Sequence, residues 1–226
     1  MAHKRLSAFF TWCMKHEHCV VHPCLNSDLP PNDFKRERVL SDAELRIVWD
    51  CCRNDDYGRI VKLLILSGCR ADEIGQLKWD EIDFDPGAIK LAPERTKNGR
   101  PHTVPITDMV REIIESIPHK VSRDYLFGSR ADGFKSWNKA KLALGDAIAE
   151  RWVVHDLRRT FRTGLGRLGV RPDVAELCVN HRKGGMQAIY DRYNYEGEIA
   201  AAFAAWSDHV QSVVTGSERK VVPLRA

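Results

Sequence analysis

One short segment combines a histidine with arginines at a spacing that suits the binding of an anion. In the segment 155–159, His155 and Arg158 are three residues apart, and on a helix they therefore share one face. An imidazole and a guanidinium side by side can grip a single phosphate, because the guanidinium forks over two of its oxygens. A histidine-based zinc site is the competing interpretation, but it requires a spacing such as His-Glu-x-x-His, which the sequence lacks.

Arg70 and Lys97 are two further cations at informative positions. Arg70 precedes an expected helix, with Glu73 one turn later, and one interpretation is an ordinary ion pair between these two residues. The other is anion binding, because a cation at a helix N-terminus opposes the macrodipole unless an anion docks beside it. Lys97 is expected at the tip of a hairpin, where an ammonium on a mobile finger can deliver a proton or a charge to a phosphate.

His181 and Tyr190 complete the set of residues that can act on a phosphate. Tyr190 follows His181 by nine residues, and Tyr193 and Tyr195 come soon after. A tyrosine in a helix most often packs in a core or an interface. A phenolic oxygen can also attack phosphorus and form a covalent ester, provided that nearby cations stabilise the transition state. The side-chain chemistry alone does not distinguish among the three tyrosines.

The order and spacing of these residues together resemble the tyrosine site-specific recombinase (phage integrase) family, over about residues 39–214. The matching segments are Gly-Cys-Arg-x-x-Glu at 68–73, Thr-Lys-Asn-Gly at 96–99, His-Asp-Leu-Arg-Arg-Thr-Phe at 155–161 and Asn-His-(x8)-Tyr at 180–190. Two departures from the family pattern are minor. Ser67 replaces the usual threonine before Gly68, and Asn180 replaces the glycine of Leu-Gly-His, where asparagine can tolerate a left-handed backbone.

The resemblance implies a role for each residue around one scissile phosphate. Arg70 and Arg158 would clamp the two non-bridging oxygens. His155 and His181 would donate to the phosphate and assist proton transfer. Glu73 would support Arg70 without contacting the phosphate itself.

The resemblance also implies the chemical step. Tyr190 would be the nucleophile and form a 3′-phosphotyrosyl ester, while Lys97 would protonate the leaving 5′ oxygen. Tyr190 is preferred to Tyr193 because it lies nine residues after His181, as in the family, and because the glycine pair at 184–185 would let its short helix swing. The ester conserves the energy of the broken bond, so neither ATP nor another cofactor is expected, and the cationic side chains make a metal unnecessary.

The resemblance extends to partners. A double-stranded DNA attachment site is the expected ligand, with Arg100 and Arg159 as additional DNA contacts. Further copies of the chain would join in a tetrameric synaptic complex. Two alternatives remain: a catalytically silent, sequence-specific DNA-binding protein on the same scaffold, and a DNA-relaxing enzyme similar to type IB topoisomerases.

Composition is consistent with a DNA-binding protein. The chain has 226 residues, of which 43% are hydrophobic and 29% charged, values typical of globular proteins. Its net charge of +4 is concentrated in residues 90–193, where 20 Lys and Arg face 12 Asp and Glu. Such an excess indicates either a polyanionic partner or merely a solvated basic surface. No apolar run is long enough for a transmembrane helix, and the seven cysteines predict reduced thiols in a cytoplasmic protein. The resemblance implies that this protein is bacterial or phage-encoded and associated with DNA.

Hydrophobic periodicity predicts an α+β fold that is mostly α-helical and carries a small three-stranded antiparallel sheet. The expected helices cover 6–14, 41–53, 57–67, 71–79, 108–116, 135–150, 155–168, 172–180, 185–191 and 197–214, and the expected strands cover 81–84, 88–91 and 102–106. Ser41 and Glu44 form a predicted capping box at the second helix. Gly68 is expected to end the third.

Four parts of the chain are expected. Residues 1–24 resemble the last helix of a mostly absent core-binding domain, 25–38 a linker, 39–214 the catalytic domain and 215–226 a mobile tail. The cysteine- and histidine-rich stretch at 13–24 matches no standard zinc finger, so ordinary thiols are expected there. The last helix, with aromatic residues at 203 and 206, is expected either to pack on its own domain or to dock on a neighbouring copy.

Overall fold

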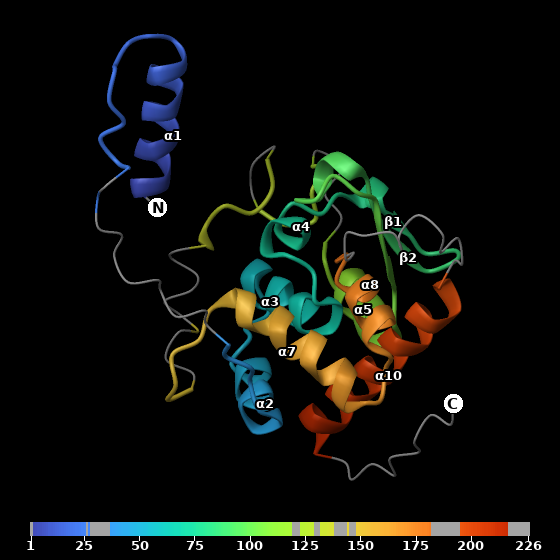
Figure 1. Ribbon diagram of the computed structural model, residues 1–226. Helices are drawn as coiled ribbons and strands as arrows, with labels where there is room; N and C mark the ends of the chain where they lie inside the picture. The colour runs from blue at the N-terminus through green and yellow to red at the C-terminus, as the bar shows by residue number, and fades with distance from the viewer. Residues whose placement is uncertain are drawn as a thin grey trace. The chain divides into compact units, whose positions relative to one another are not determined.

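The computed structural model of the chain describes residues 2–25, 27, 37–118, 123–128, 132–137, 144, 148–181 and 195–216. The chain divides into two compact units, Met1–Glu37 and Arg38–Ala226 (Figure 1). The expected helix at 185–191, most of the expected helix at 135–150 and the tail after 216 lie outside the described residues. Of the helices that are described, none combines the length and the apolar character needed to cross a membrane.

The first unit consists of one helix and a segment that folds back on it. α1 (Ala2–Lys15) extends beyond the predicted 6–14 at both ends. Nε2 of His22 lies 3.1 Å from the carbonyl oxygen of Ser7, which ties the following segment to the helix. The ring of His16 lies against Trp12, with 4.5 Å between centroids. The imidazoles of this stretch therefore take part in packing the unit.

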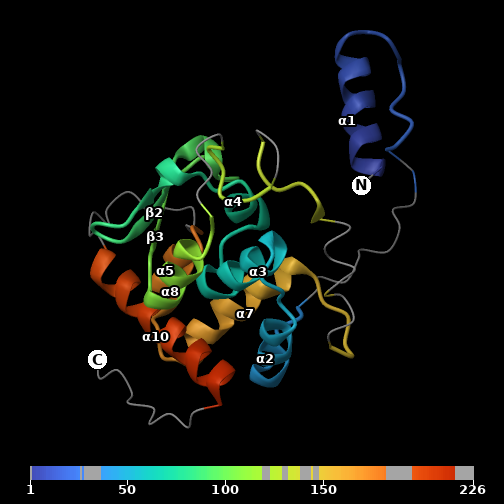
Figure 2. The same cartoon turned by 180° about the vertical axis from the view of Figure 1, so that it is seen from behind.

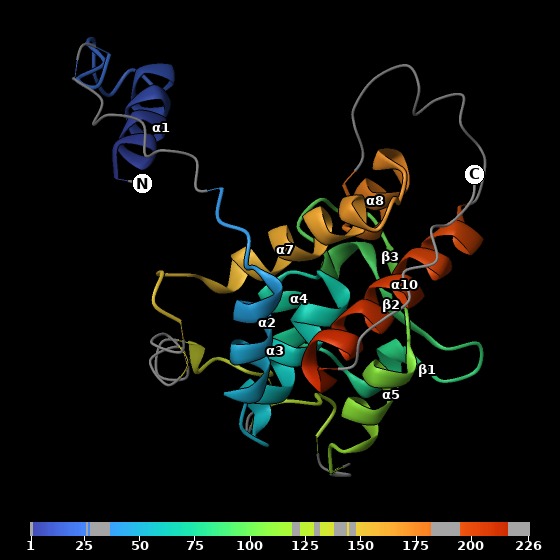
Figure 3. The same ribbon diagram turned by 90° about the horizontal axis from the view of Figure 1, so that it is seen from below.

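The second unit is built around the buried helix α3 (Asp56–Ser67). It packs against α4 (Ala71–Gly75), α5 (Asp108–Glu115), α7 (Val154–Arg167) and α10 (Glu196–Thr215), among other described elements (Figures 1 and 3). Asp55 caps the start of α3 by accepting a hydrogen bond from the amide of Gly58 at 2.8 Å. Gly68 ends it in the left-handed conformation, with φ of 61°, as predicted. Apolar side chains cover nearly every face of α3, so the helix forms the centre of the core.

The preceding helix, α2 (Asp42–Asp50), begins at the predicted capping box. Oγ of Ser41 accepts from the amide of Glu44 at 3.3 Å, and Oε2 of Glu44 accepts from the amide of Ser41 at 2.9 Å. The amide of Leu40 donates to the hydroxyl of Thr160, in α7, at 2.9 Å. The start of the second unit is thus attached to the core by a buried hydrogen bond.

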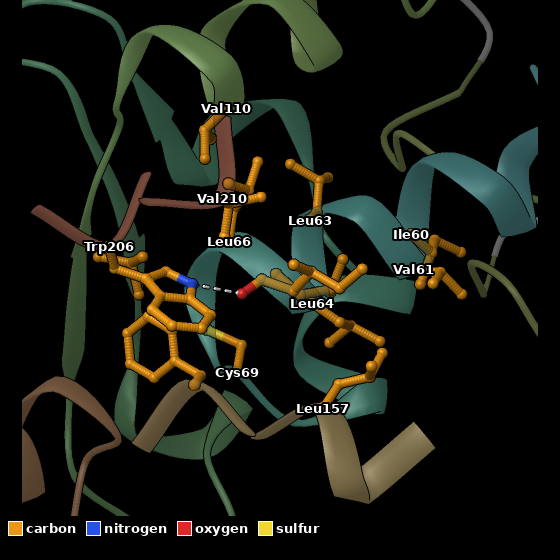
Figure 4. Packing of buried hydrophobic residues seen from close by; sticks show 14 of the residues in the cluster. Ile60, Val61, Leu63, Leu64, Leu66, Cys69, Val110, Leu157, Trp206 and Val210 are labelled. Atoms are coloured by element: carbon orange, nitrogen blue, oxygen red, sulfur yellow. Dashed lines mark hydrogen bonds between the residues drawn. The ribbon is translucent and has the colours of Figure 1, made fainter. Parts of the chain in front are cut away.

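The last helix packs on its own domain. α10 contacts α2, α3, α7 and α8 (Pro172–Cys178), and its buried aromatic residues are Phe203 and Trp206. Nε1 of Trp206 donates to the carbonyl oxygen of Ile65 at 2.8 Å, the dashed bond in Figure 4. The indole also lies over Gly164, where an added Cβ would come within 2.0 Å of it. This packing agrees with the first of the two expectations for the helix, and docking on a neighbouring copy stays a prediction.

The predicted three-stranded antiparallel sheet is confirmed. β1 (Ile82–Asp83), β2 (Ala88–Leu91) and β3 (His102–Pro105) pair in that order, and β3 lies beside α10 (Figure 2). Ile89 is buried opposite Val104, whereas Lys90 points to solvent, the alternation that a half-buried strand requires. The connection from β2 to β3 contains a single 3₁₀ turn, η2 (Pro93–Arg95).

The predicted helix over 71–79 is wrong in its end point. α4 stops at Gly75, and a 3₁₀ turn, η1 (Trp79–Glu81), shortens the predicted strand 81–84 to β1. The carbonyl oxygen of Gly75 accepts from the amide of Phe134 at 2.9 Å, and that of Leu77 accepts from the amide of Leu126 at 2.9 Å. The amide of Trp79, which would donate to Gly75 in a continued helix, donates instead to the carbonyl oxygen of Asp124 at 2.9 Å.

Candidate active site

Arg158 lies near the start of α7 and only 4% of it is exposed. Nη1 donates to the carbonyl oxygen of Gly68 at 2.6 Å, and Nη2 donates to that of Val179. These two residues end α3 and α8, where helix carbonyls lack partners within their own helix. A guanidinium between two helix C-termini is favoured by both dipoles, so the fold holds Arg158 in one orientation.

His181 directly contacts this arginine. Nη2 of Arg158 lies 3.1 Å from Nε2 of His181, and Nδ1 of His181 lies 3.0 Å from Oε2 of Glu176. An arginine can only donate, so Nε2 accepts, and the ring proton is on Nδ1, facing the carboxylate. Desolvation and the charge of Arg158 lower the pKa of His181, against the opposing effect of Glu176. His181 is therefore neutral near pH 7.

Arg70 forms the predicted pair with Glu73. Nη1 of Arg70 donates to Oε1 of Glu73 at 2.7 Å, and the amide of Arg70 donates to Oε2 at 2.8 Å. Glu73 is 2% exposed, whereas the side chain of Arg70 is 20% exposed. The buried carboxylate of Glu73 thus holds the guanidinium of Arg70 near the surface. In this position Arg70 can also bind an anion from solution.

The two arginines lie close enough to affect each other. Desolvation and the nearby charge of Arg70 lower the pKa of Arg158. In the described part of the chain, no carboxylate accepts a hydrogen bond from Arg158. Arg158 is thus a buried cation beside a second cation, Arg70, and among the described residues only Arg70 has a bound carboxylate. The positive charge of this site is not fully compensated, so the site favours binding of an anion.

His155 and Arg159 are on the same helix as Arg158. His155 is exposed, and desolvation together with the charges of Arg159 and Arg158 lowers its pKa. Nη1 of Arg159 lies 2.5 Å from Oδ1 of the buried Asp156, so part of its charge is compensated within the protein. The helix thus presents a histidine at the surface one turn before the buried arginine.

Lys97 and Arg100 lie in the turn between β2 and β3, and both are exposed. Among the described residues, no hydrogen bond or ion pair involves the ammonium of Lys97. The turn itself is held, because Nδ2 of Asn98 donates to the carbonyl oxygen of Asn180 at 2.6 Å. The side chain next to Lys97 thus attaches the turn to the residue before His181, and the mobility of the finger stays a prediction.

Within the described residues, one group of three side chains has the donor atoms that a metal ion could bind, and it includes Glu73, the partner of Arg70. Donor atoms of Cys69, Glu73 and His102 lie within 4.8 Å of one another, and all three residues are buried. Both oxygens of Glu73 already accept from Arg70, and burial raises the pKa of the Cys69 thiol to about 12. Two guanidiniums nearby further oppose a cation. The group does not fit a metal ion, and we assign none to it.

Three residues at the site were not among those predicted. Glu176 sets the tautomer of His181, Asn98 holds the turn, and His102 donates from Nε2 to the carbonyl oxygen of Cys178 at 3.2 Å. The sequence carried only weak signals for them. Asn98 stands in the matched Thr-Lys-Asn-Gly segment, and His102 interrupts an otherwise apolar strand face.

The structure brings Arg70, Arg158 and His181 together, and it places Lys97 in a turn attached to the same region. The expected nucleophile Tyr190 and its rival Tyr193 lie outside the described residues. The third tyrosine, Tyr195, is described. It immediately precedes α10, and its ring lies 6.0 Å from the guanidinium carbon of Arg171.

Comparison with known proteins gives one consistent result. Residues 40–196 match the model of the phage integrase family. Prophage integrase IntA of Escherichia coli K12 is 30% identical over 162 residues, which make up 68% of this chain and 38% of that protein. The chain spans less than half the length of the first curated relatives that it matches.

Solved structures share the fold. The integrase of mycobacterium phage Brujita aligns with a TM-score of 0.63 and 19% identity, over 94% of this chain and 75% of that one. A lambda integrase tetramer bound to a Holliday junction aligns with a TM-score of 0.61 and 15% identity, over 86% of this chain and 60% of that one.

Proposed function

The chain belongs to the phage integrase family, and from that premise we propose that it is a site-specific DNA recombinase, which breaks and rejoins strands through a 3′-phosphotyrosyl intermediate. The single observation that best supports this function is the pair of neighbouring arginines, of which only Arg70 has a bound carboxylate within the part of the chain that the structure describes. A scissile phosphate supplies the missing negative charge. Arg70 and Arg158 bind its two non-bridging oxygens, and Glu73 keeps Arg70 in place.

The cleavage step moves two protons. The phenolic oxygen of Tyr190 forms a bond to phosphorus as the bond from phosphorus to the 5′ oxygen breaks. His155 and His181 border the phosphate. The bare ring nitrogen of a neutral imidazole takes the phenol proton, and a ring N–H donates a hydrogen bond to a phosphate oxygen. The ammonium of Lys97 gives its proton to the departing 5′ oxygen. Rejoining reverses these transfers, so the bond energy is retained in the ester.

The proposed ligand is a double-stranded DNA attachment site, bound by several copies of the chain. The basic excess of residues 90–193 supports a DNA partner, with Arg100 and Arg159 as phosphate contacts. Lambda integrase has been solved as a tetramer on a Holliday junction, and we extend a tetrameric synaptic complex to this chain by analogy. If copies exchange α10, Trp206 would bind the equivalent site of the neighbouring copy, and the contacts of α10 would be retained.

We also propose that strand cleavage requires no metal ion. Side-chain cations already stand where a metal would neutralise the phosphate. Cleavage should therefore persist in EDTA at the rate seen without it. Loss of cleavage on chelation, with recovery on adding magnesium, would contradict metal independence without affecting the identity of the nucleophile.

The deciding experiment traps the covalent intermediate. The chain is incubated with a library of nicked duplexes of randomised sequence, so that the short fragment 3′ of the cut diffuses away and the adduct accumulates. Protein-linked DNA is recovered after denaturation in SDS, its sequence is read, and the adduct is mapped to a peptide. We expect the peptide that contains Tyr190, no adduct with Tyr190→Phe, and undiminished adduct with the matched control Tyr193→Phe.

Each alternative function predicts a different outcome of that experiment. A silent DNA-binding protein would retain DNA reversibly and yield no adduct. A relaxing enzyme similar to topoisomerases would give adducts without sequence preference and would relax plasmids that lack a target site. An adduct that survives in Tyr190→Phe would assign the nucleophile to another tyrosine.

A further inference from the structure

We infer that Asn98 is a positioning residue, which fastens the Lys97 turn to the loop that carries His181. The inference rests on the proposed function, because Lys97 is assigned there as the proton donor to the leaving 5′ oxygen. In this role Asn98 and Asn180 do not contact the phosphate. They hold the general acid, Lys97, at a fixed place relative to the phosphate-binding groups.

The two ends of the Asn98 side chain serve different purposes. Its oxygen, Oδ1, closes the turn by accepting from the amide of Arg100 at 3.3 Å, alongside Thr96, whose hydroxyl donates to the carbonyl oxygen of Arg100 at 2.6 Å. Its nitrogen, Nδ2, leaves the turn and donates to the carbonyl oxygen of Asn180, 82 residues further along the chain, at 2.6 Å. The amide side chain therefore shapes the turn and anchors it at once.

Asn180 returns the contact with its own side chain. Nδ2 of Asn180 donates to Oδ1 of Asn98 and to the carbonyl oxygen of Arg100, each at 3.3 Å. Asn180 is 8% exposed and has φ of 50°, the left-handed conformation expected at this position. The glycine usual in the resembled pattern would adopt the same backbone but could not make these two bonds. The departure from glycine thus adds to the attachment.

Four consecutive residues, 178–181, link the hairpin and Arg158 in alternation. The carbonyl oxygen of Cys178 accepts from His102, at the start of β3, and Asn180 bonds to Asn98. The other two residues of the segment bond to Arg158: the carbonyl oxygen of Val179 and Nε2 of His181 both accept from its guanidinium. One short backbone segment therefore sets the distance between the phosphate-binding arginine and the turn that carries Lys97.

This arrangement matters because Lys97 is exposed and has four rotatable bonds. A general acid must lie within hydrogen-bond reach of the atom that it protonates, and a displacement of about 1 Å can lower a rate by about 100-fold. Because Asn98 anchors the backbone beside Lys97, the position of the ammonium depends only on the rotamers of the Lys97 side chain. Asn98 does not touch the DNA in this scheme, so its loss should affect proton donation and not phosphate binding.

A substrate with a better leaving group separates a defect in proton donation from a defect in binding or stabilising the phosphate. The nicked duplex recovered in the trapping experiment is prepared with sulfur in place of the bridging 5′ oxygen. A thiolate departs without being protonated, so cleavage of this DNA needs no general acid. We expect Lys97→Ala to lower cleavage of the ordinary DNA by about 100-fold or more and Asn98→Ala by about 10- to 100-fold. Both variants should cleave the sulfur-substituted DNA nearly as fast as the unsubstituted protein.

Three further variants sharpen the comparison. Arg158→Ala should remain defective on the sulfur-substituted DNA, because its loss affects the phosphate itself. Asn180→Gly keeps the carbonyl acceptor of the 2.6 Å bond and loses only the two bonds of 3.3 Å, so its defect should be smaller than that of Asn98→Ala. Asn54→Ala, in an exposed loop, is the matched control and should cleave both DNAs normally.

The outcomes that overturn the inference are distinct from failure of the proposed function. Normal cleavage of ordinary DNA by Asn98→Ala, or a defect that the sulfur substitution does not relieve, would show that Asn98 does not act through Lys97. The double variant Lys97→Ala/Asn98→Ala should be no slower than Lys97→Ala alone, and additive losses would also contradict the inference. If the unsubstituted protein cleaves neither DNA, the proposed function is wrong and this role of Asn98 falls with it.

Discussion

Nη2 of Arg158 and Nε2 of His181 lie 3.1 Å apart, with the arginine as donor and the imidazole as acceptor. This contact joins a residue of α7 to the segment that follows α8, at the point where a phosphate is proposed to bind. It leaves Nδ1 of His181 to carry the ring proton, which faces Oε2 of Glu176 at 3.0 Å. The protonation state of His181 is therefore set by one neighbour on each side.

We predict that His181 is neutral at pH 7, with its proton on Nδ1, and that it titrates below 6.5. Desolvation and Arg158 lower the pKa of His181, whereas Glu176 raises it. Glu176→Gln removes the carboxylate and should lower the pKa of His181 further. Nitrogen chemical shifts of the imidazole, followed by NMR across the titration, report both the tautomer and the pKa. A titration at or above 6.5 would contradict the contact with Arg158.

Arg70→Ala and Arg158→Ala should both reduce cleavage, by about 100-fold or more, because each removes charge-assisted donors from the transition state. Their effects on stability should differ. Arg158 is buried and satisfies the carbonyl oxygens of Gly68 and Val179, so its loss should destabilise the fold by about 1–3 kcal/mol for each carbonyl left unpaired. Adduct formation and urea unfolding measure the two effects. Near-normal cleavage by either variant would place the phosphate elsewhere.

The buried His102 should make the fold sensitive to acid. Desolvation, with Arg158 and Arg70 adding to it and Glu73 opposing, lowers the pKa of His102 to about 4. Between about 6.5 and 4 the unfolded chain binds a proton on His102 that the folded chain does not, so stability falls as the pH falls. The interval corresponds to about 3 kcal/mol, lost in full near pH 4.

His102→Gln tests this assignment, since its amide nitrogen can still donate to Cys178. Urea unfolding at several pH values should show a shallower loss of stability in this variant than in the unsubstituted protein. His16→Gln, at an exposed position directly after α1, is the control and should leave the slope unchanged. Equal slopes in all three proteins would mean that another group accounts for the acid sensitivity.

Trp206→Ala should destabilise the second unit by about 3–5 kcal/mol, because it empties a large buried volume and leaves the carbonyl oxygen of Ile65 without its donor. Trp12→Ala, at a half-exposed position of α1, should have a much smaller effect. The packing of α10 is intramolecular, so the unfolding midpoint should not depend on protein concentration. A midpoint that rises with concentration would indicate that a second copy supplies this helix.

DNA binding by this chain should be weak and steeply dependent on salt. Each phosphate contact contributes a slope of about −0.9 in the plot of log affinity against log salt concentration. Arg100→Ala should reduce the slope by about one contact, because its exposed side chain lies in the turn beside Lys97. Arg159→Ala should reduce it less, since Asp156 already compensates part of that charge. Tight binding that is insensitive to salt would contradict the proposal that basic residues within 90–193 contact DNA phosphates.

Features that depend on residues close together in the chain were predictable from sequence. The capping box of Ser41 and Glu44 and the left-handed backbone at Gly68 and Asn180 each follow from side chains within a few residues. The three-stranded sheet follows from strand periodicity and local turns. The spacing of the basic residues likewise led to the family, because the pattern of residue types along the chain is what defines it.

Contacts between distant segments were decided only by the tertiary structure. α4 ends at Gly75, whose carbonyl oxygen accepts from the amide of the distant Phe134, and no local signal marks that bond. Asn98 and Asn180 are 82 residues apart, and each alone is an ordinary loop residue. A hydrogen bond between such residues has no periodicity or motif, because the same amide could bond to water or to its own turn. Only the packing of the β2–β3 hairpin against the end of α8 brings the two side chains within reach and gives each a partner.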